Sequence, residues 1–146
     1  MRAYVLRNAR ELGDLNEVSL EYLLRFHEYK IEAVNREMIK LGNLIVLHGH
    51  ELGESVFSPV NPARGFFLKA KASTLMGHYH QVSHHSESNL NGEQVGVWST
   101  GCLCNLSPEY RPYAYTKWSN GFAYVTVNED KTFQVKNFRI LDGKIL

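Results

Sequence analysis

The chain has 146 residues, a length that suits one domain, and we expect residues 1–146 to form a single one. The formal net charge of +1 gives no electrostatic reason to expect binding to nucleic acid or to an anionic membrane. The sequence has no apolar run of roughly 18 residues for a membrane span and no signal peptide at its start. Its two cysteines, Cys102 and Cys104, are too close together for a good disulfide, so we expect a reducing, cytoplasmic setting.

Residues 1–30 predict short helices. Ser19 can cap a helical segment over residues 20–26, whose apolar side chains are spaced three and four apart. Gly13-Asp14 marks a break before that segment. Residues 31–34 then alternate between apolar and polar side chains, which is typical of a strand.

The middle of the chain predicts a strand–helix–strand unit. Gly42-Asn43 is a turn signal between residues 38–41 and a partner strand at 44–47. After a loop over residues 49–61, Asn61 and Pro62 are a good cap and first turn for a helix over residues 63–72. A strand at residues 73–76 follows, so the two apolar strands and the helix between them resemble a βαβ unit.

The last third of the chain predicts mostly strands. Residues 83–94 are polar, with Asn91-Gly92 as a turn, and residues 94–99 form an apolar strand pattern. Residues 105–118 are rich in Pro and Tyr, which favours an ordered loop. Residues 121–128 and 132–141 alternate well, and they predict a closing antiparallel hairpin.

The histidines are the most informative feature of the sequence. Six of the seven lie between residues 48 and 85, in three groups. These groups are His48 and His50, His78 and His80, and His84 and His85. The first two groups each follow a short apolar run, which predicts imidazoles at the rim of a sheet. Single histidines are usually ordinary surface or core residues, but paired ones at strand ends favour a transition-metal site.

The two leading groups form recognisable motifs. His48-Gly49-His50 after one strand and Gly77-His78-Tyr79-His80 after the next resemble the HG or HGH and GHxH motifs of the calcineurin-like metallophosphoesterases. Residues 101–103, 118–122 and 143–144 resemble the tail of a phage and bacterial branch of that family. Residues 4–12 resemble the segment that follows the family's GNH[DE] motif.

The resemblance implies a role for each matching histidine. His48 and His78 would bind the second metal of a two-metal site, and His80 would bind the first. The ions would be divalent Mn, Zn, Fe or Ni, which accept imidazole ligands. Two such ions would bind a phosphate and lower the pKa of a shared water, which would then attack phosphorus.

The family's DxH, GDxxD and GNH[DE] motifs do not occur in this sequence. The chain therefore resembles the C-terminal half of a metallophosphoesterase domain. The expected fold class is α+β. The chain would form the C-terminal half of a four-layer α/β/β/α sandwich, with a largely antiparallel sheet and one crossover helix. The missing motifs would supply the remaining metal ligands and the acid histidine, so we expect the catalytic set to be incomplete and the chain to be inactive alone.

Several other residues have two interpretations. His50 is a candidate catalytic residue that contacts the substrate phosphate, and a structural role is the alternative. Arg64 is a candidate for substrate binding because guanidinium matches two phosphate oxygens, and an exposed helix face is the alternative. His84 and His85 could touch metal or substrate, or could be ordinary polar residues. Cys102 and Cys104 suit zinc by type, but free thiols are favoured because neither a CxxC pair nor a matching histidine spacing accompanies them.

The function implied by the resemblance is hydrolysis of a phosphomonoester or phosphodiester, including one in a nucleotide or nucleic acid. The alternative is a non-catalytic remnant that binds a metal or a protein partner. A third explanation is that the missing motifs are encoded upstream of Met1. Loss of half the sandwich would expose apolar sheet surface, so we expect either a homo-oligomer or pairing with a separate N-terminal polypeptide, and no membrane association.

Overall fold

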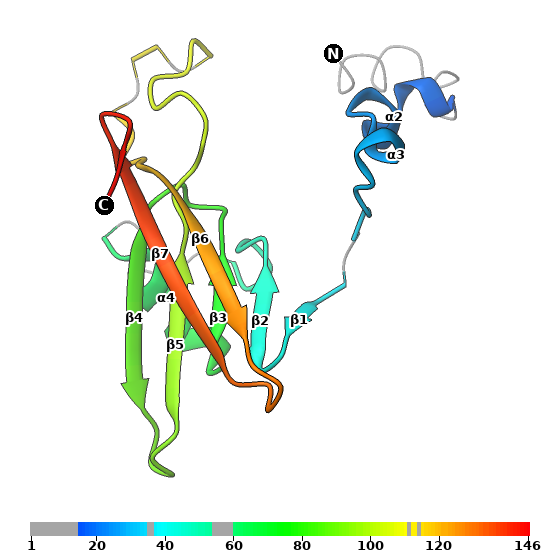
Figure 1. The fold of residues 1–146 in the computed structure, drawn as a ribbon. Coiled ribbons are helices and arrows are strands. Elements are labelled where there is room, and N and C mark those ends of the chain that lie inside the picture. Colours follow the sequence, from blue (N-terminus) through cyan, green and yellow to red (C-terminus); the bar gives the residue numbers. More distant parts are fainter. Residues whose placement is uncertain (1–14, 35–36, 54–59, 111, 114) are drawn as a thin grey trace. The chain divides into compact units, whose positions relative to one another are not determined.

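The computed structural model describes residues 15–34, 37–53, 60–110, 112–113 and 115–146 (Figure 1). The chain divides into two compact units, Met1–Glu37 and Met38–Leu146. The break predicted at Gly13-Asp14 lies outside the described residues. None of the helices in the described ranges has the length and apolar character needed to span a bilayer.

The described part of the first unit contains short helices, as predicted. These are the 3-10 helix η2 (Asn16–Val18) and the α-helices α2 (Leu20–Leu23) and α3 (Phe26–Tyr29). Ser19 caps α2, since its Oγ accepts a hydrogen bond from the Tyr22 N–H at 3.1 Å. The single helix predicted over residues 20–26 is wrong in extent, because Arg25 adopts a left-handed conformation with φ of 56° and separates α2 from α3.

The strand suggested by the alternation of residues 31–34 is also wrong. These residues form no regular element in the structure. Ile31 and Val34 are 50% and 40% exposed, so the apolar positions do not line a buried face. Alternation marks a strand only where one side of the chain is covered and a neighbouring strand provides backbone partners.

The second unit is organised around sheet A, whose strand order is β1-β2-β3-β5-β4 (Figure 1). The strands are β1 (Ile39–Leu41), β2 (Leu44–Leu47), β3 (Thr74–Met76), β4 (Ser83–Ser88) and β5 (Gln94–Ser99). The central strands β2, β3 and β5 run parallel, and the edge strands β1 and β4 are antiparallel to their neighbours. The hairpin predicted at Gly42-Asn43 is confirmed, with Gly42 at a φ of 60° that favours glycine.

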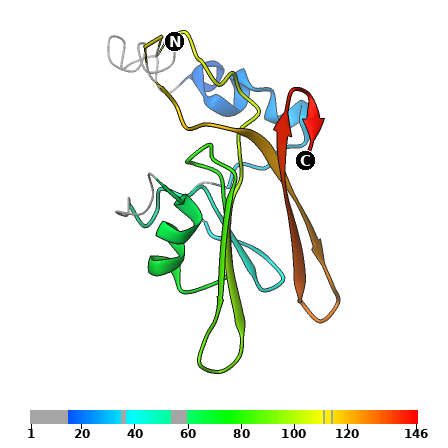
Figure 2. The same cartoon turned by 90° about the vertical axis from the view of Figure 1, so that its left-hand side faces the viewer.

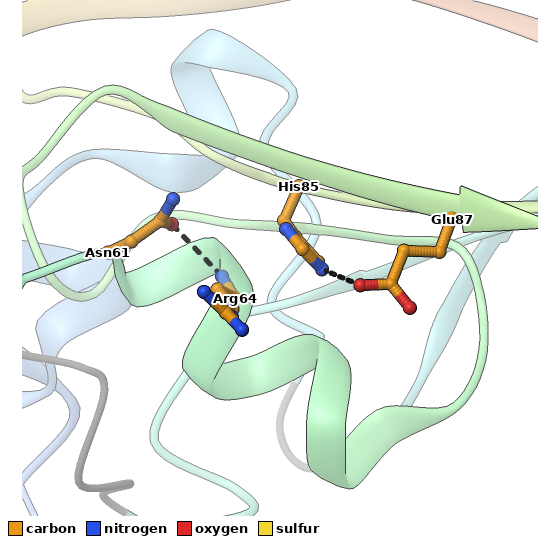
Figure 3. Close-up of polar contacts among 4 residues, drawn as sticks. All are labelled: Asn61, Arg64, His85 and Glu87. Carbon is orange, nitrogen blue, oxygen red and sulfur yellow. Dashed lines mark hydrogen bonds and ion pairs between the residues drawn. The ribbon is translucent and has the colours of Figure 1, made fainter.

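Helix α4 (Pro62–Ala70) connects β2 to β3, which confirms the predicted βαβ unit. Asn61 is the cap, because its Oδ1 accepts a hydrogen bond from the Arg64 N–H at 3.0 Å (Figure 3). Phe66 lies on the inner side of the helix and is 2% exposed. It packs in one cluster with Ala63 of the helix, Met76 of β3 and Val97 of β5. This cluster is the buried core between α4 and sheet A.

Strand β4 was not predicted, because its sequence is almost entirely polar. Ser83–Ser88 nevertheless pairs with all of β5. A strand at the edge of a sheet is stabilised by backbone hydrogen bonds on one side and needs little apolar surface. Its side chains still point alternately to the two faces of the sheet. His84 stacks on Trp98, whereas His85 packs against Phe67 of α4.

Sheet B covers the face of sheet A opposite α4 (Figure 2). It contains β6 (Asn120–Val127), β7 (Phe133–Leu141) and β8 (Lys144–Ile145), so the predicted hairpin is confirmed and β8 is an addition. Asn137 joins the sheets, since its side-chain amide donates hydrogen bonds to the carbonyls of Ser83 and Ser99 at 3.2 and 3.0 Å. The predicted α+β class with mostly antiparallel pairing is therefore confirmed. The four-layer sandwich stays a prediction.

Candidate metal centre

The loops that follow β2 and β3 lie side by side. The two strands are parallel neighbours, so their carboxyl ends meet at one edge of sheet A. Two backbone hydrogen bonds continue this pairing beyond the strands, because the N–H groups of Gly77 and His78 donate to the His48 carbonyl at 3.0 and 2.8 Å. The HGH and GHxH motifs are therefore brought together, although 30 residues separate His48 from His78.

Three of the predicted histidines form a cluster at this edge. His78 Nδ1 lies 2.9 Å from His48 Nε2, and the centroids of the two rings are 4.9 Å apart. The His50 ring lies 5.0 Å from that of His48 and 5.9 Å from that of His78. All three residues are exposed, so an ion in solution can reach their ring nitrogens.

Glu51 shapes the loop that carries His48 and His50. Its carboxylate accepts hydrogen bonds from the His48 and Gly49 N–H groups at 2.8 and 2.6 Å. Partial burial alone would raise the pKa of this carboxyl, but hydrogen bonds from the backbone of Glu51, Gly49 and His48 outweigh it and lower the pKa. The sequence analysis missed Glu51, for which the only signal was an acidic residue directly after the HGH motif.

Gly49 allows the close approach of the two loops. It has a φ of 118°, which L side chains rarely adopt, and it is buried. A Cβ at this position would lie 3.0 Å from the Cβ of His78. The glycine between the two histidines of the HGH motif therefore lets the backbone turn tightly beneath His78.

The environment of His78 favours the neutral imidazole, the form that binds metal. Its pKa is lowered by partial burial and by repulsion from His48, His50 and His80, which together outweigh the attraction of Glu51. A neutral ring keeps a lone pair available for an ion near pH 7. His78 therefore lies beside a second imidazole and has the protonation state of a metal ligand.

His80 lies on the same loop as His78, but its ring has other neighbours. The ring packs edge-on against Trp118, with centroids 4.6 Å apart, and its Nδ1 lies 4.0 Å from Cys104 Sγ. The ligand atoms of His80, Cys102 and Cys104 all lie within 4.8 Å of one another. These three residues could hold a metal ion, a grouping that the sequence analysis missed because the residues are far apart in the chain.

The two cysteines are free thiols in the structure, as the sequence favoured. Cys102 is buried and Cys104 is exposed. Burial raises the pKa of the Cys102 thiol, and a hydrogen bond with the Cys104 side chain raises it further. In the absence of a cation, Cys102 is therefore a poorly reactive thiol.

The remaining candidates lie on α4 and β4. Arg64 is exposed in the first turn of α4, and Figure 3 shows it with His85 and Glu87 of β4. His85 Nε2 lies 2.8 Å from Glu87 Oε1 and its ring packs against Phe67, whereas His84 stacks on Trp98 with ring centroids 5.0 Å apart. Through these contacts, His84 packs on β5 and His85 packs on α4.

His84 offers a test of the packing between the sheets. It lines a cavity of about 560 Å³ together with Trp98 and Phe133, and its pKa is lowered by partial burial and by the neighbouring His85. Because the folded protein disfavours the charged ring, the unfolded chain takes up the proton first as the pH falls below about 6.5. Stability should therefore decline from that pH down to the folded pKa, and more steeply than in a His84→Gln variant.

Two measurements check this expectation. Proton NMR titration should place the pKa of His84 below 6.5, and urea unfolding near pH 7 and near pH 5.5 should give a smaller difference for His84→Gln than for the wild type. A His84 pKa at or above its ordinary value would contradict the stacked, partly buried position on Trp98.

Comparison with known proteins adds no family to this description. No family model matches the chain, and neither a curated protein nor a solved structure is significantly similar to it. The function is therefore argued from the motifs and from the geometry of the histidine cluster.

Proposed function

We propose that the chain contributes the histidine side of a two-metal site that hydrolyses phosphoesters, as in metallophosphoesterases. The observation that carries this proposal is the contact between His48 Nε2 and His78 Nδ1 at 2.9 Å, made by side chains from the ends of neighbouring parallel strands. Two adjacent exposed imidazoles are a common arrangement at a transition-metal site.

The distance between the two nitrogens agrees with shared coordination. Metal–nitrogen bonds are about 2.0–2.1 Å long, so two ligands of one ion are separated by about 2.9 Å at a right angle and about 3.3 Å at a tetrahedral angle. The observed separation of 2.9 Å equals the value for a right angle, and the two rings would turn so that both lone pairs face the ion. Without an ion the same two nitrogens share a hydrogen bond. On metal binding the donor ring would carry its proton on its other nitrogen, which frees a lone pair for the ion.

In this proposal the residues keep the roles implied by the motifs. His48 and His78 would bind the second ion. The motif makes His80 the ligand of the first ion, although its ring lies beside Cys104 and Trp118 and not beside His48 and His78. The ions, Mn, Zn, Fe or Ni, would neutralise charge on the phosphate and supply a hydroxide for attack on phosphorus. His50, whose ring lies 5.0 Å from that of His48, would contact a phosphate oxygen. Arg64 stays a candidate for substrate binding.

A bridging carboxylate has to come from elsewhere in this proposal. Glu51 is the acidic residue beside the cluster, and both of its oxygens already accept backbone hydrogen bonds. These hydrogen bonds hold the Glu51 carboxylate against the backbone of its own loop. We infer that another polypeptide or a further segment carries DxH, GDxxD and GNH[DE] and completes the site for a phosphomonoester or phosphodiester, including one in a nucleotide or nucleic acid.

The metal-binding part of the proposal is tested with Mn²⁺, which prefers nitrogen and oxygen ligands to thiolates. The electron paramagnetic resonance signal of free Mn²⁺ measures how much is bound. We expect His48→Ala to weaken Mn²⁺ binding by about 10-fold or more, because one of two adjacent ligands is lost. His27→Ala, which removes an exposed histidine from α3, is the control and should bind as the wild type does. Equal binding by His48→Ala and the wild type would contradict the proposal.

Hydrolysis is tested separately with a chromogenic phosphodiester and Mn²⁺. The isolated chain should show negligible turnover, because the loss of each catalytic group typically costs about 100-fold or more. Translating the DNA on both sides of the coding region should identify the polypeptide that carries the missing motifs. Adding it should restore turnover, which His78→Ala should abolish. Binding of Mn²⁺ without any restored turnover would instead favour a non-catalytic metal-binding or protein-interaction module.

A further inference from the structure

We propose that His80, Cys102 and Cys104 bind one Zn²⁺ ion and leave its fourth coordination position open. This site goes beyond the proposed function, since it gives His80, the motif's ligand for the first ion, two thiolate partners that the histidine motifs do not imply. One histidine and two thiolates are a known ligand set for zinc that keeps a position for water or substrate. Two thiolates and a neutral imidazole also balance the double positive charge of the ion.

The spacing of the three ligand atoms is close to what zinc needs. Zinc–sulfur bonds of about 2.3 Å and zinc–nitrogen bonds of about 2.0–2.1 Å place tetrahedral ligands about 3.6–3.8 Å apart. His80 Nδ1 lies 4.0 Å from Cys104 Sγ, and all three ligand atoms lie within 4.8 Å of one another. Cys104 is exposed, so a small rotation of its side chain closes the remaining gap without disturbing a packed core.

The backbone holds the three ligands against a common segment at the start of β6. The Ser119 N–H donates to the His80 carbonyl at 2.8 Å, and the Ser119 carbonyl accepts from the Cys102 N–H at 3.0 Å. The side-chain amide of Asn120 donates to the carbonyls of Cys102 and Cys104 at 3.1 and 2.9 Å. Residues distant in the sequence are therefore positioned before any ion binds, which lowers the entropic cost of binding.

The backbone conformation and packing of His80 limit where its ring can point. Its φ of 56° is left-handed, which is uncommon for a residue with a side chain and costs free energy. Trp118 packs against the imidazole, with ring centroids 4.6 Å apart, and so limits the orientations of the ring. Strained backbone of this kind persists where the surrounding structure holds it, often at binding sites. Here it directs Nδ1 toward the thiol of Cys104.

One neighbour of Cys102 suits a metal-bound thiolate, although the thiol in this structure donates to the Ser119 carbonyl at 3.7 Å. Asn120 Nδ2 lies 3.9 Å from Cys102 Sγ, so the amide that fixes the loop can also donate toward the sulfur. Hydrogen bonds of this type orient metal ligands and stabilise their charge. A disulfide is a poor alternative, because neighbouring cysteines with one residue between them seldom reach its geometry.

Cobalt(II) is the probe, because it replaces zinc and gives a thiolate-to-metal charge-transfer band in the near ultraviolet. Under reducing conditions the wild-type chain should develop this band at one equivalent of Co²⁺, and Zn²⁺ should displace it. Cys104→Ser should lose most of the band and bind Zn²⁺ at least about 10-fold more weakly. Cys104 is exposed, and serine is nearly isosteric with it, so this variant should fold as the wild type does.

His80→Gln and His48→Ala make the test specific. His80→Gln should weaken Co²⁺ binding, whereas His48→Ala should keep the thiolate band because His48 belongs to the other cluster. Absence of the band from the wild type, or an unchanged band in Cys104→Ser, would overturn the thiolate site. Loss of the band in His48→Ala would also overturn it, since the ion would then bridge both clusters. Mn²⁺ binding through His48 and His78 is measured independently, so either proposal can fail without the other.

Discussion

Replacing Phe66 by alanine is expected to lower the free energy of unfolding by about 3–5 kcal/mol. Phe66 is 2% exposed and packs in one cluster with Ala63, Met76 and Val97. Alanine would remove most of this contact surface and leave a cavity between α4 and the central strands. Because α4 connects β2 to β3, the lost packing energy destabilises the βαβ unit that brings His48 and His78 together. Urea unfolding followed by circular dichroism measures the change.

Leu68→Ala is the matched control for Phe66→Ala. Leu68 lies on the same helix and is 40% exposed, so its truncation removes less buried surface and should cost less than about 1.5 kcal/mol. Equal losses in the two variants would mean that α4 does not pack on sheet A through Phe66. A loss below about 1.5 kcal/mol in Phe66→Ala would have the same meaning.

Replacing Gly101 by alanine is expected to cost about 3 kcal/mol or more, because no space exists for a methyl group. A Cβ on Gly101 would overlap the Ser119 carbonyl oxygen and come within 2.6 Å of the Gly121 nitrogen. Both are backbone atoms of the segment at the start of β6, so they cannot move aside as the end of a side chain would. The substitution should also disturb the hydrogen bonds that join Cys102 to Ser119 and Gly121.

Gly77→Ala is the control for Gly101→Ala. Its nearest contact would be Thr100 Oγ1 at 3.5 Å, an ordinary van der Waals distance, and its backbone is not left-handed. Alanine there should change stability by less than about 1 kcal/mol in either direction. If Gly101→Ala were as stable as Gly77→Ala in urea unfolding, the loop of residues 101–104 would not be packed against β6 as described.

The elements that the sequence predicted correctly carry strong local signals. Asn61 caps α4, Gly42-Asn43 turns between β1 and β2, and the hairpin of β6 and β7 follows clear alternation. In each case the cap or turn that starts the element lies within a few residues, so residue types alone indicate it. The α+β class follows from the order of these elements.

The errors arise where a distant part of the chain decides the outcome. The polar β4 is a strand because β5 offers it backbone partners, and residues 31–34 are not a strand because nothing in the described structure pairs with them. Sequence patterns report which side chains could face a core. Whether a neighbouring strand is present depends on the tertiary fold.

For the candidate site too, local motifs could be predicted from the sequence and long-range groupings could not. His48, His50 and His78 were identified from the sequence alone, because short motifs at strand ends carry imidazoles in a regular spacing. Only the tertiary structure placed His80 beside Cys102 and Cys104, and only it gave Glu51 its role in the loop. The physical reason is the range of the interactions involved. Caps, turns and strand patterns depend on neighbours in the chain, whereas a ligand set depends on which loops the sheets bring to the same edge.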